Sequence, residues 1–180
     1  MIKPSRKRLI EKASSVKLLI LDVDGVMTDG GIILDGGGGE LKKFHVRDGH
    51  GIKMLQSAGI KVALITGRES EVVERRAKEL GIAEVYQRCH IKSAAYEHLL
   101  EKLNVSDAET AYVGDDIVDI SLLRRVGLPV AVADACEEAK ANALFITKNG
   151  GGKGAVREVA DFLLKAKGLW DGIIDEHSKI

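Results

Sequence analysis

Cysteine, net charge and long apolar runs are all scarce in this sequence of 180 residues. The two cysteines, Cys89 and Cys136, are far apart and lack the spacing of a metal-binding pair, which argues against a disulfide framework or a zinc site and favours a reducing cytoplasm. Lysine plus arginine equals aspartate plus glutamate at 27 each, so no overall field attracts nucleic acid or a membrane surface. No stretch approaches the roughly 20 apolar residues of a membrane helix. We therefore expect a cytoplasmic protein with neither nucleic acid nor membrane as a partner.

The N-terminal segment, residues 1–15, is basic, as the start of a signal peptide is. The apolar stretch that a signal peptide requires is missing, because Leu9 and Ile10 are followed at once by Glu11 and Lys12. We interpret this segment as a solvated leading helix or arm. The length and the ordinary globular composition, 45% hydrophobic and 30% charged, predict one domain over residues 1–180.

Residues 17–28, KLLILDVDGVMT, are the most informative segment. The continuous apolar run from Leu18 to Leu21 is typical of a strand buried on both faces of a parallel sheet. Asp22 follows at the carboxyl end of that strand, where open α/β sheets bind their ligands. Asp24 lies two residues further, so in extended backbone both carboxylates face the same way. Two such carboxylates repel each other unless they share a proton or bind a divalent cation.

The DVDG segment has other interpretations. Aspartate commonly ends strands and precedes glycine in turns, so a simple turn remains open from this segment alone. A calcium-binding loop would need an acid or Asn at its fifth position and Gly at its sixth, where this chain has Val26 and Met27. The calcium loop is therefore excluded.

Strand and helix signals alternate along the rest of the chain. Predicted strands cover residues 18–21, 61–65, 84–86, 111–113, 130–132 and 144–146. Predicted helices cover residues 48–59, a segment ending at 81, a segment ending at 103, and residues 117–126, 137–142 and 154–167. This alternation, with short connections, predicts an α/β fold with a doubly wound, Rossmann-like parallel sheet.

Residues 31–46, between the first strand and the first long helix, predict a protruding β-hairpin. Apolar runs at 32–34 and 41–46 flank a glycine-rich turn at 35–39. The arms are apolar yet too short to form a core, which favours a role in oligomerisation, with a flap packed on its own subunit as the alternative. Neither this turn nor the segment 150–154 has the spacing of a nucleotide-phosphate loop.

Residues suited to phosphate chemistry lie at the ends of four predicted strands. They are Asp22 and Asp24, then Thr66 and Gly67, then Lys92, and finally Asp115, Asp116 and Asp119. The carboxyl ends of parallel strands meet in one crevice. Carboxylates can hold Mg²⁺ there, while an ammonium group and free backbone N–H groups neutralise phosphate oxygens.

As an ordered set, the segments DVDGV, TGR, the later Lys92 and GDDIVD resemble the four motifs of the haloacid dehalogenase superfamily of phosphohydrolases. The resemblance implies that Asp22 is the nucleophile, which forms an aspartyl phosphate. Asp24 would be the acid/base that protonates the leaving oxygen and then activates water. The same resemblance implies Mg²⁺ as the cofactor, bound by Asp22, Asp115 and the main-chain oxygen of Asp24.

The other motif positions receive supporting roles by the same resemblance. Thr66 and Gly67 would bind phosphate, and Lys92 would hold both the phosphate and the nucleophile. Asp116 or Asp119 would not bind the ion directly but would hold the residues that do. An acid at the start of a helix also stabilises that helix, so Asp119 is equally well explained as an N-terminal cap.

Many members of the superfamily enclose the substrate with an inserted cap domain, for which this chain has no room. A capless site is open to water, which weakens electrostatic catalysis, and a neighbouring subunit would supply the missing wall. The segments FHVRDGHGIKML, ALITGRES and GGKGAVREV are similar to those of a capless, tetrameric family of sugar-acid phosphatases, in which four hairpins assemble into a barrel. This resemblance implies a homotetramer assembled through the 31–46 hairpin.

The same family resemblance implies a small-molecule substrate, an eight-carbon sugar acid phosphate used in lipopolysaccharide precursor synthesis. Arg68 and Arg76 are implied contacts of the sugar acid, since an arginine fork matches a carboxylate, although Arg76 is also explained as a solvated surface charge. The tail 168–180 would act as a lid over a neighbour's site. A nine-carbon sugar acid phosphate, or another sugar phosphate, is the alternative substrate. A phosphoacceptor signalling domain is the non-enzyme alternative, but residues 85–87 offer no accepting aspartate.

Overall fold

The computed structural model describes residues 5–179 and confirms the doubly wound α/β fold. A six-stranded parallel sheet has the order β5-β4-β1-β6-β7-β8. Its strands are β1 (Leu18–Leu21), β4 (Lys61–Ile65), β5 (Glu84–Tyr86), β6 (Thr110–Gly114), β7 (Leu128–Ala131) and β8 (Phe145–Ile146). The chain builds β4 and β5 on one side of β1 and then crosses to β6, so the strand order reverses next to β1, where such sheets form their binding crevice.

Strand β1 is central because it is apolar on both faces. Its four residues are fully buried, and Leu21 pairs with Leu64 of β4 and Val113 of β6. Continuous apolar strands of this kind need helices on both sides of the sheet. Asp22, which follows β1, therefore lies between the carboxyl ends of β4 and β6.

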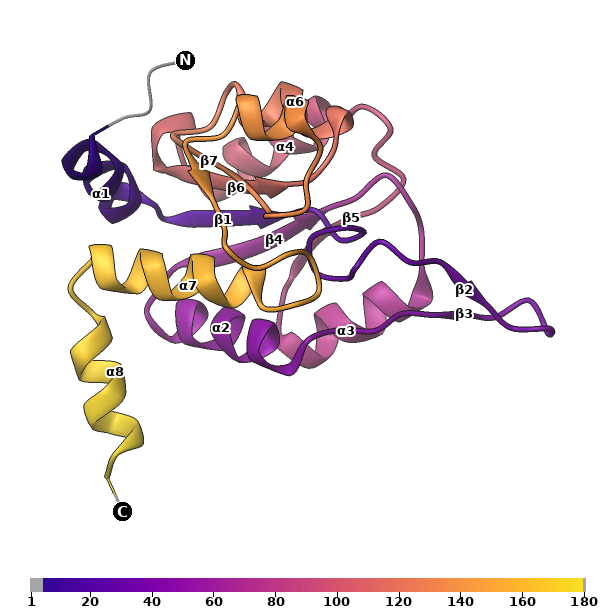
Figure 1. Ribbon diagram of the computed structural model, residues 1–180, viewed down its shortest axis with the longest axis horizontal. Helices are drawn as coiled ribbons and strands as arrows, with labels where there is room; N and C mark the ends of the chain where they lie inside the picture. Colours follow the sequence, from indigo (N-terminus) through magenta and orange to yellow (C-terminus); the bar gives the residue numbers. More distant parts are fainter. Residues whose placement is uncertain (1–4, 180) are drawn as a thin grey trace.

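Helices cover both faces of the sheet. They are α1 (Arg6–Ser15), α2 (Val46–Ser57), α3 (Glu71–Leu80), α4 (Lys92–Leu103), α5 (Ile120–Leu123), α6 (Glu137–Ala141), α7 (Ala155–Ala166) and α8 (Trp170–His177), with 3-10 turns η1 (Asp107–Glu109) and η2 (Ile117–Asp119). Helices α2, α3 and α7 lie on one face, and α4 and α6 on the other (Figure 1). Helix α7 is amphipathic and buries Val159 and Leu163 in the hydrophobic core. None of the helices in residues 5–179 is long and apolar enough to cross a bilayer.

Some element boundaries differ from the sequence-based expectation. The helix predicted over 117–126 is divided into η2 and the short α5, because the side chain of Asp119 turns back to accept the N–H groups of Asp115 and Asp116 at 2.8 and 3.2 Å. The second arm of the hairpin ends at Leu41, not at residue 46: residues 42–45 form neither strand nor helix, and α2 begins at Val46. The leading segment does form a helix over 6–15, while its residues 1–4, like residue 180 of the tail, lie outside the described part of the chain.

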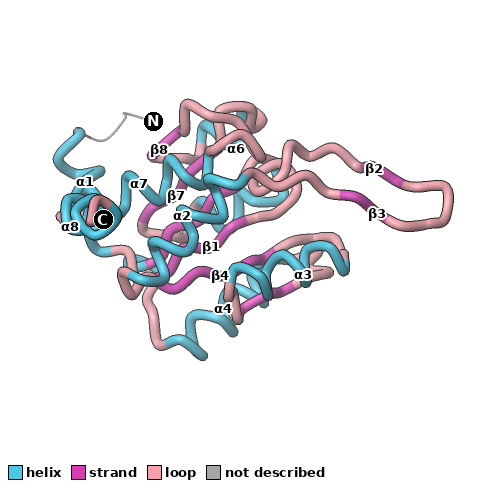
Figure 2. The backbone as a smooth tube through the Cα atoms, turned by 90° about the horizontal axis from the view of Figure 1, so that it is seen from below, coloured by secondary structure: helices cyan, strands magenta, loops and turns pink. Residues whose placement is uncertain are grey.

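The hairpin of β2 (Ile33–Leu34) and β3 (Glu40–Leu41) projects away from the body of the protein (Figures 1 and 2). Its apolar side chains at Ile33, Leu34 and Leu41 are exposed. A flap packed on its own subunit would bury them, so this arrangement argues against that alternative. An isolated two-stranded ribbon is at best marginally stable in water.

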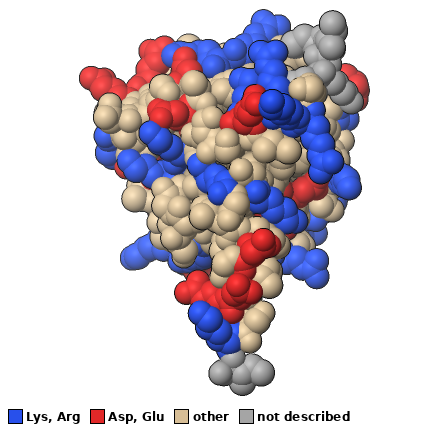
Figure 3. Space-filling model, turned by 90° about the vertical axis from the view of Figure 1, so that its left-hand side faces the viewer, with Lys and Arg blue, Asp and Glu red and all other residues tan. Residues whose placement is uncertain are grey.

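Helix α8, within the tail, lies at the end opposite the hairpin (Figures 1 and 2). It packs on α7, and the rings of His177 and His50 of α2 are 5.6 Å apart. Figure 3 views this end: basic side chains are spread over its upper part, and acidic side chains gather toward the projecting helix. The tail therefore leaves the carboxyl edge of the sheet in its own subunit uncovered.

Candidate active site

Three carboxylates from separate segments converge at the carboxyl edge of the sheet. Asp22 follows β1, while Asp115 and Asp119 follow β6, and one oxygen of each lies within 4.8 Å of the others. Asp22 and Asp119 are buried, with exposed fractions of 6% and 0%. The structure thus brings together the acids that the sequence predicts for one crevice.

Lys92 neutralises part of this negative charge. It is the first residue of α4, is buried, and places Nζ 2.9 Å from Asp22 Oδ2 and 2.6 Å from Asp119 Oδ1. Lys92 also donates a hydrogen bond to the hydroxyl of Tyr112, which itself donates to Asp119 Oδ1 at 2.6 Å. Sequence reasoning missed Tyr112, because a tyrosine within an apolar strand gives no sign that its hydroxyl reaches a lysine.

Burial shifts the titration of these groups. It raises the pKa of Asp22 to about 6 despite the opposing charge of Lys92. Burial, and then the charges of Asp22 and Asp119, raise the pKa of Asp115 to about 7. Burial by itself would lower the pKa of Lys92, but the attraction of Asp22 and Asp119 outweighs it and raises that pKa. The lysine stays charged, while the two aspartates lack a sufficient counter-charge.

The donor set fits a divalent cation such as Mg²⁺, which prefers hard oxygen ligands. Asp119 is poorly placed to be one of those ligands, since Oδ1 is occupied by Lys92 and Oδ2 by backbone N–H groups. It is better suited to hold Lys92 and the 115–116 backbone in place. Gly25, with φ +87°, permits the close approach of Asp115: a Cβ at this position would lie 2.1 Å from Asp115 Oδ2.

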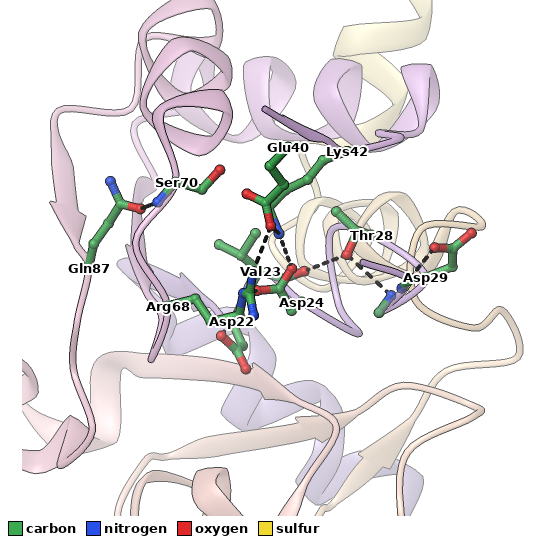
Figure 4. Close-up of polar contacts among 12 residues, drawn as sticks. Asp22, Val23, Asp24, Thr28, Asp29, Glu40, Lys42, Arg68, Ser70 and Gln87 are labelled. Atoms are coloured by element: carbon green, nitrogen blue, oxygen red, sulfur yellow. Dashed lines mark hydrogen bonds and ion pairs between the residues drawn. The ribbon is translucent and has the colours of Figure 1, made fainter. Parts of the chain in front are cut away.

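Asp24 lies nearby but belongs to a second group of charges. Its carboxylate forms ion pairs with Lys42 and, at 3.6 Å, with Arg68 Nε, and Arg68 also binds Glu40 at 2.8 Å (Figure 4). Lys42 and Glu40 were not among the predicted site residues. They lie at the base of the hairpin, which the sequence indicated only as an assembly element.

The predicted phosphate-binding segment follows β4. Thr66 is buried, but its N–H is already bonded to Tyr86 O at 2.9 Å, so its hydroxyl and the N–H of Gly67 are the groups left for an anion. Helix α3 begins at Glu71, four residues after Gly67, and Ser70 N–H is fixed by Gln87 Oε1 (Figure 4). The cleft of about 380 Å³ at this edge is lined by Asp22, Asp24, Thr66, Gly67, Arg68, Cys89, His90, Lys92, Asp115, Asp116 and Val118.

Arg76 is the predicted site residue that the structure places elsewhere. It lies on α3, pairs with Glu79 at 2.8 Å and covers the ring of Phe44 at 5.6 Å. It is not part of the cleft lining in this subunit. A contact between Arg76 and substrate would therefore have to be made in the cleft of another subunit.

A glycine turn supports the loop that carries the site. Gly151 packs so closely against this loop that a Cβ would lie 1.8 Å from Gly25 O, and Gly152 N–H donates to Val26 O at 3.0 Å. Asp134 Oδ1 accepts the N–H of Gly151 at 2.8 Å. From the sequence, this GGGK segment was only compared with a nucleotide-phosphate loop, whose spacing it lacks. In the structure it packs against residues 25–28 and supports them.

Comparisons with known proteins agree with this geometry. A family model described as haloacid dehalogenase-like hydrolase matches residues 45–127. The chain is 48% identical over 168 residues, 93% of its length and 89% of the relative, to the 3-deoxy-D-manno-octulosonate 8-phosphate phosphatase KdsC of Escherichia coli strain K12.

Solved structures of such phosphatases share the fold. The one from Moraxella catarrhalis, in complex with a magnesium ion, a phosphate ion and a KDO molecule, has a TM-score of 0.94 at 41% identity and covers 96% of this chain and 99% of that chain. The one from Yersinia pestis has a TM-score of 0.91 at 46% identity, with coverage of 92% and 89%. These matches confirm the resemblance carried by the four motifs. The chain belongs to the haloacid dehalogenase-like hydrolases, in the family of phosphatases that these relatives represent.

Proposed function

We propose that this protein is a Mg²⁺-dependent phosphoric monoester hydrolase that converts 3-deoxy-D-manno-octulosonate 8-phosphate into the free sugar acid and phosphate. It would act as a single domain in the cytoplasm, in lipopolysaccharide precursor synthesis. The observation that carries the proposal is the convergence of Asp22, Lys92 and Asp115 on one cleft, in a chain that matches phosphatases of this substrate over nearly its whole length.

The site residues account for the reaction in two steps. Asp22 attacks phosphorus, the bond between phosphorus and the sugar oxygen breaks, and Asp24 gives that oxygen a proton. Asp24 then takes a proton from water as the water oxygen attacks phosphorus, which releases phosphate and restores Asp22. Lys92, 2.9 Å from Asp22, holds the nucleophile and offsets the charge of the incoming dianion.

Mg²⁺ bound between Asp22, Asp115 and the main-chain oxygen of Asp24 would supply the remaining positive charge that lets a carboxylate approach a phosphate. The hydroxyl of Thr66 and the N–H of Gly67 are the protein's own donors to the phosphate oxygens. Arg68, at the rim of the same cleft, is the candidate partner of the sugar carboxylate.

Asp24→Asn is expected to slow hydrolysis of the phosphoenzyme by about 10²- to 10⁴-fold, because the amide cannot accept a proton from water. Rapid-quench measurement should then show the covalent intermediate accumulating to a higher level than in the unaltered enzyme. Wild-type rates in this variant would show that Asp24 has been given the wrong role.

Shortening the hairpin tip, residues 35–39, is expected to lower both the oligomer size and the activity. We propose a homotetramer in which the exposed Ile33, Leu34 and Leu41 are covered by neighbouring copies, and in which Arg76 and the tail 168–180 contribute to a neighbour's open cleft. Light scattering and steady-state kinetics on the same samples test this. A fully active monomer would contradict the contribution of a second subunit.

A panel of phosphates tests the substrate. The eight-carbon sugar acid phosphate should show a much higher kcat/KM than a nine-carbon sugar acid phosphate or a hexose phosphate, because the carboxylate position relative to the phosphate sets which substrates reach Arg68. A preference for the nine-carbon sugar acid phosphate would show that it, and not the eight-carbon compound, is the substrate. Equal rates on all three would contradict recognition of a sugar acid.

A further inference from the structure

Four charged side chains form a closed ring between the hairpin and the cleft. Lys42 Nζ contacts Asp24 and lies 3.4 Å from Glu40 Oε1. On the opposite side of the ring, Arg68 reaches Asp24 Oδ2 at 3.6 Å and Glu40 Oε1 at 2.8 Å (Figure 4). Each acid therefore has two cationic partners, and the four formal charges cancel.

Lys42 is the most deeply buried member of this ring. Only 1% of its side chain is exposed, compared with 73% for the adjacent Lys43, which pairs with Asp29. Removing an ammonium group from water is costly unless ion pairs and hydrogen bonds compensate. A hairpin base that served assembly alone would not need a buried charge, so the burial of Lys42 indicates a role at the cleft.

The two oxygens of Asp24 have different partners. Oδ1 is contacted by Lys42, and Oδ2 faces Arg68. Arg68 lines the cleft and is the candidate partner of the substrate, whereas Lys42 is not among the residues of the cleft lining. When a substrate carboxylate engages Arg68, Lys42 remains as the fixed partner of Asp24.

We propose that Lys42 is a positioning residue that holds the Asp24 side chain where its protonated form gives a proton to the leaving oxygen, and that Glu40 ties this arrangement to strand β3. This proposal rests on the acid/base role of Asp24 in the proposed function. By this assignment, the base of the hairpin helps to position the acid/base residue of its own subunit, in addition to any role in assembly. Because Lys42 does not line the cleft, this assignment has it act through Asp24 and not on the substrate itself.

The test compares two kinds of phosphate ester. A sugar phosphate has an alkoxide leaving group that needs a proton, whereas the nitrophenolate of p-nitrophenyl phosphate leaves without one. For Lys42→Met we expect kcat/KM for the sugar phosphate to fall about 10- to 100-fold, and kcat/KM for the aryl ester to change less than about threefold. Lys42→Arg should recover part of the lost activity, because it keeps the charge.

Matched variants separate positioning from damage to the fold. Lys43→Met removes the neighbouring exposed lysine and should leave both esters unaffected. Lys42→Met with Glu40→Gln keeps the ring neutral and should show the same selective loss if the single variant unfolds. The oligomer size and the rise in unfolding temperature on adding Mg²⁺ should match those of the unaltered protein.

Equal losses on both esters, or no loss on the sugar phosphate, would overturn the assignment of Lys42. The proposed function is judged separately, from the unaltered enzyme. If that enzyme ignores the sugar acid phosphate but hydrolyses another alkyl phosphate, the substrate is wrong and the same comparison is made with that ester. If it hydrolyses no phosphate ester, both proposals fail.

Discussion

Asp22→Asn is expected to abolish turnover, with kcat falling on the order of 10⁴-fold or more, as removal of a covalent nucleophile does in other enzymes. The amide cannot form an acyl phosphate. Asp119, the other carboxylate paired with Lys92, cannot replace Asp22, because its Oδ1 is bound by Lys92 and Tyr112 and its Oδ2 by two backbone N–H groups. Steady-state kinetics with the sugar acid phosphate measure the loss.

The fold of this variant should be retained. Asparagine keeps the oxygen that accepts Val23 N–H at 2.7 Å, and it removes a charge that burial disfavours, as the raised pKa of about 6 indicates. Without metal, its unfolding temperature should equal or exceed that of the unaltered protein. Asp29→Asn, on the exposed loop that follows the same strand, is the control and should keep activity within about twofold. Appreciable turnover by Asp22→Asn would contradict covalent catalysis.

Chelation with EDTA is expected to remove activity completely, and Mg²⁺ should restore it. Because both carboxylates must be deprotonated to bind a cation, Mg²⁺ affinity should fall roughly tenfold per pH unit between the pKa of about 7 for Asp115 and the pKa of about 6 for Asp22, and more steeply below that range. Calorimetric titration of Mg²⁺ at several pH values gives this slope without any assay of activity. Activity that survives thorough chelation, or an affinity independent of pH, would contradict the metal site.

The same shifts set the stability of the metal-free protein. The pKa values of Asp22 and Asp115 are raised from 3.8 to about 6 and about 7, so the folded state binds more protons than the unfolded state in this range. Their favourable contribution is therefore complete below about pH 4 and is lost as the pH rises through 6 to 7. Mg²⁺ should raise the unfolding temperature more at about pH 8 than at about pH 5. The reverse order would show that these carboxylates do not bind the cation.

The sequence predicts the fold, and the meeting of the motif residues at one edge of the sheet, because both depend on local signals. The apolar run at 18–21 identifies a doubly buried strand, and parallel strands carry the residues that follow them to one edge. Asp22, Lys92 and Asp115 were expected together for that reason, and the structure brings them together.

Contacts that depend on side-chain direction were not predictable in this way. Nothing in two consecutive lysines indicates that the side chain of Lys42 is buried while that of Lys43 is exposed. Likewise, a tyrosine in an apolar strand does not indicate that its hydroxyl contacts Lys92. The support that Gly151 gives to Gly25 joins segments more than a hundred residues apart, through a backbone approach that only close packing reveals. Arg76 was predicted as a substrate contact from the family resemblance, but its position on α3 places it outside the cleft of its own subunit.

The most direct test of this account is chemical trapping of the phosphoenzyme. Enzyme mixed with substrate and Mg²⁺ is quenched in acid within a single turnover, reduced with borohydride, digested and mapped by mass spectrometry. Reduction converts an aspartyl phosphate into homoserine, and we predict this change at position 22, in the peptide that contains Val23 and Asp24. Unmodified Asp22 under conditions of rapid turnover, or modification of a different carboxylate, would contradict it.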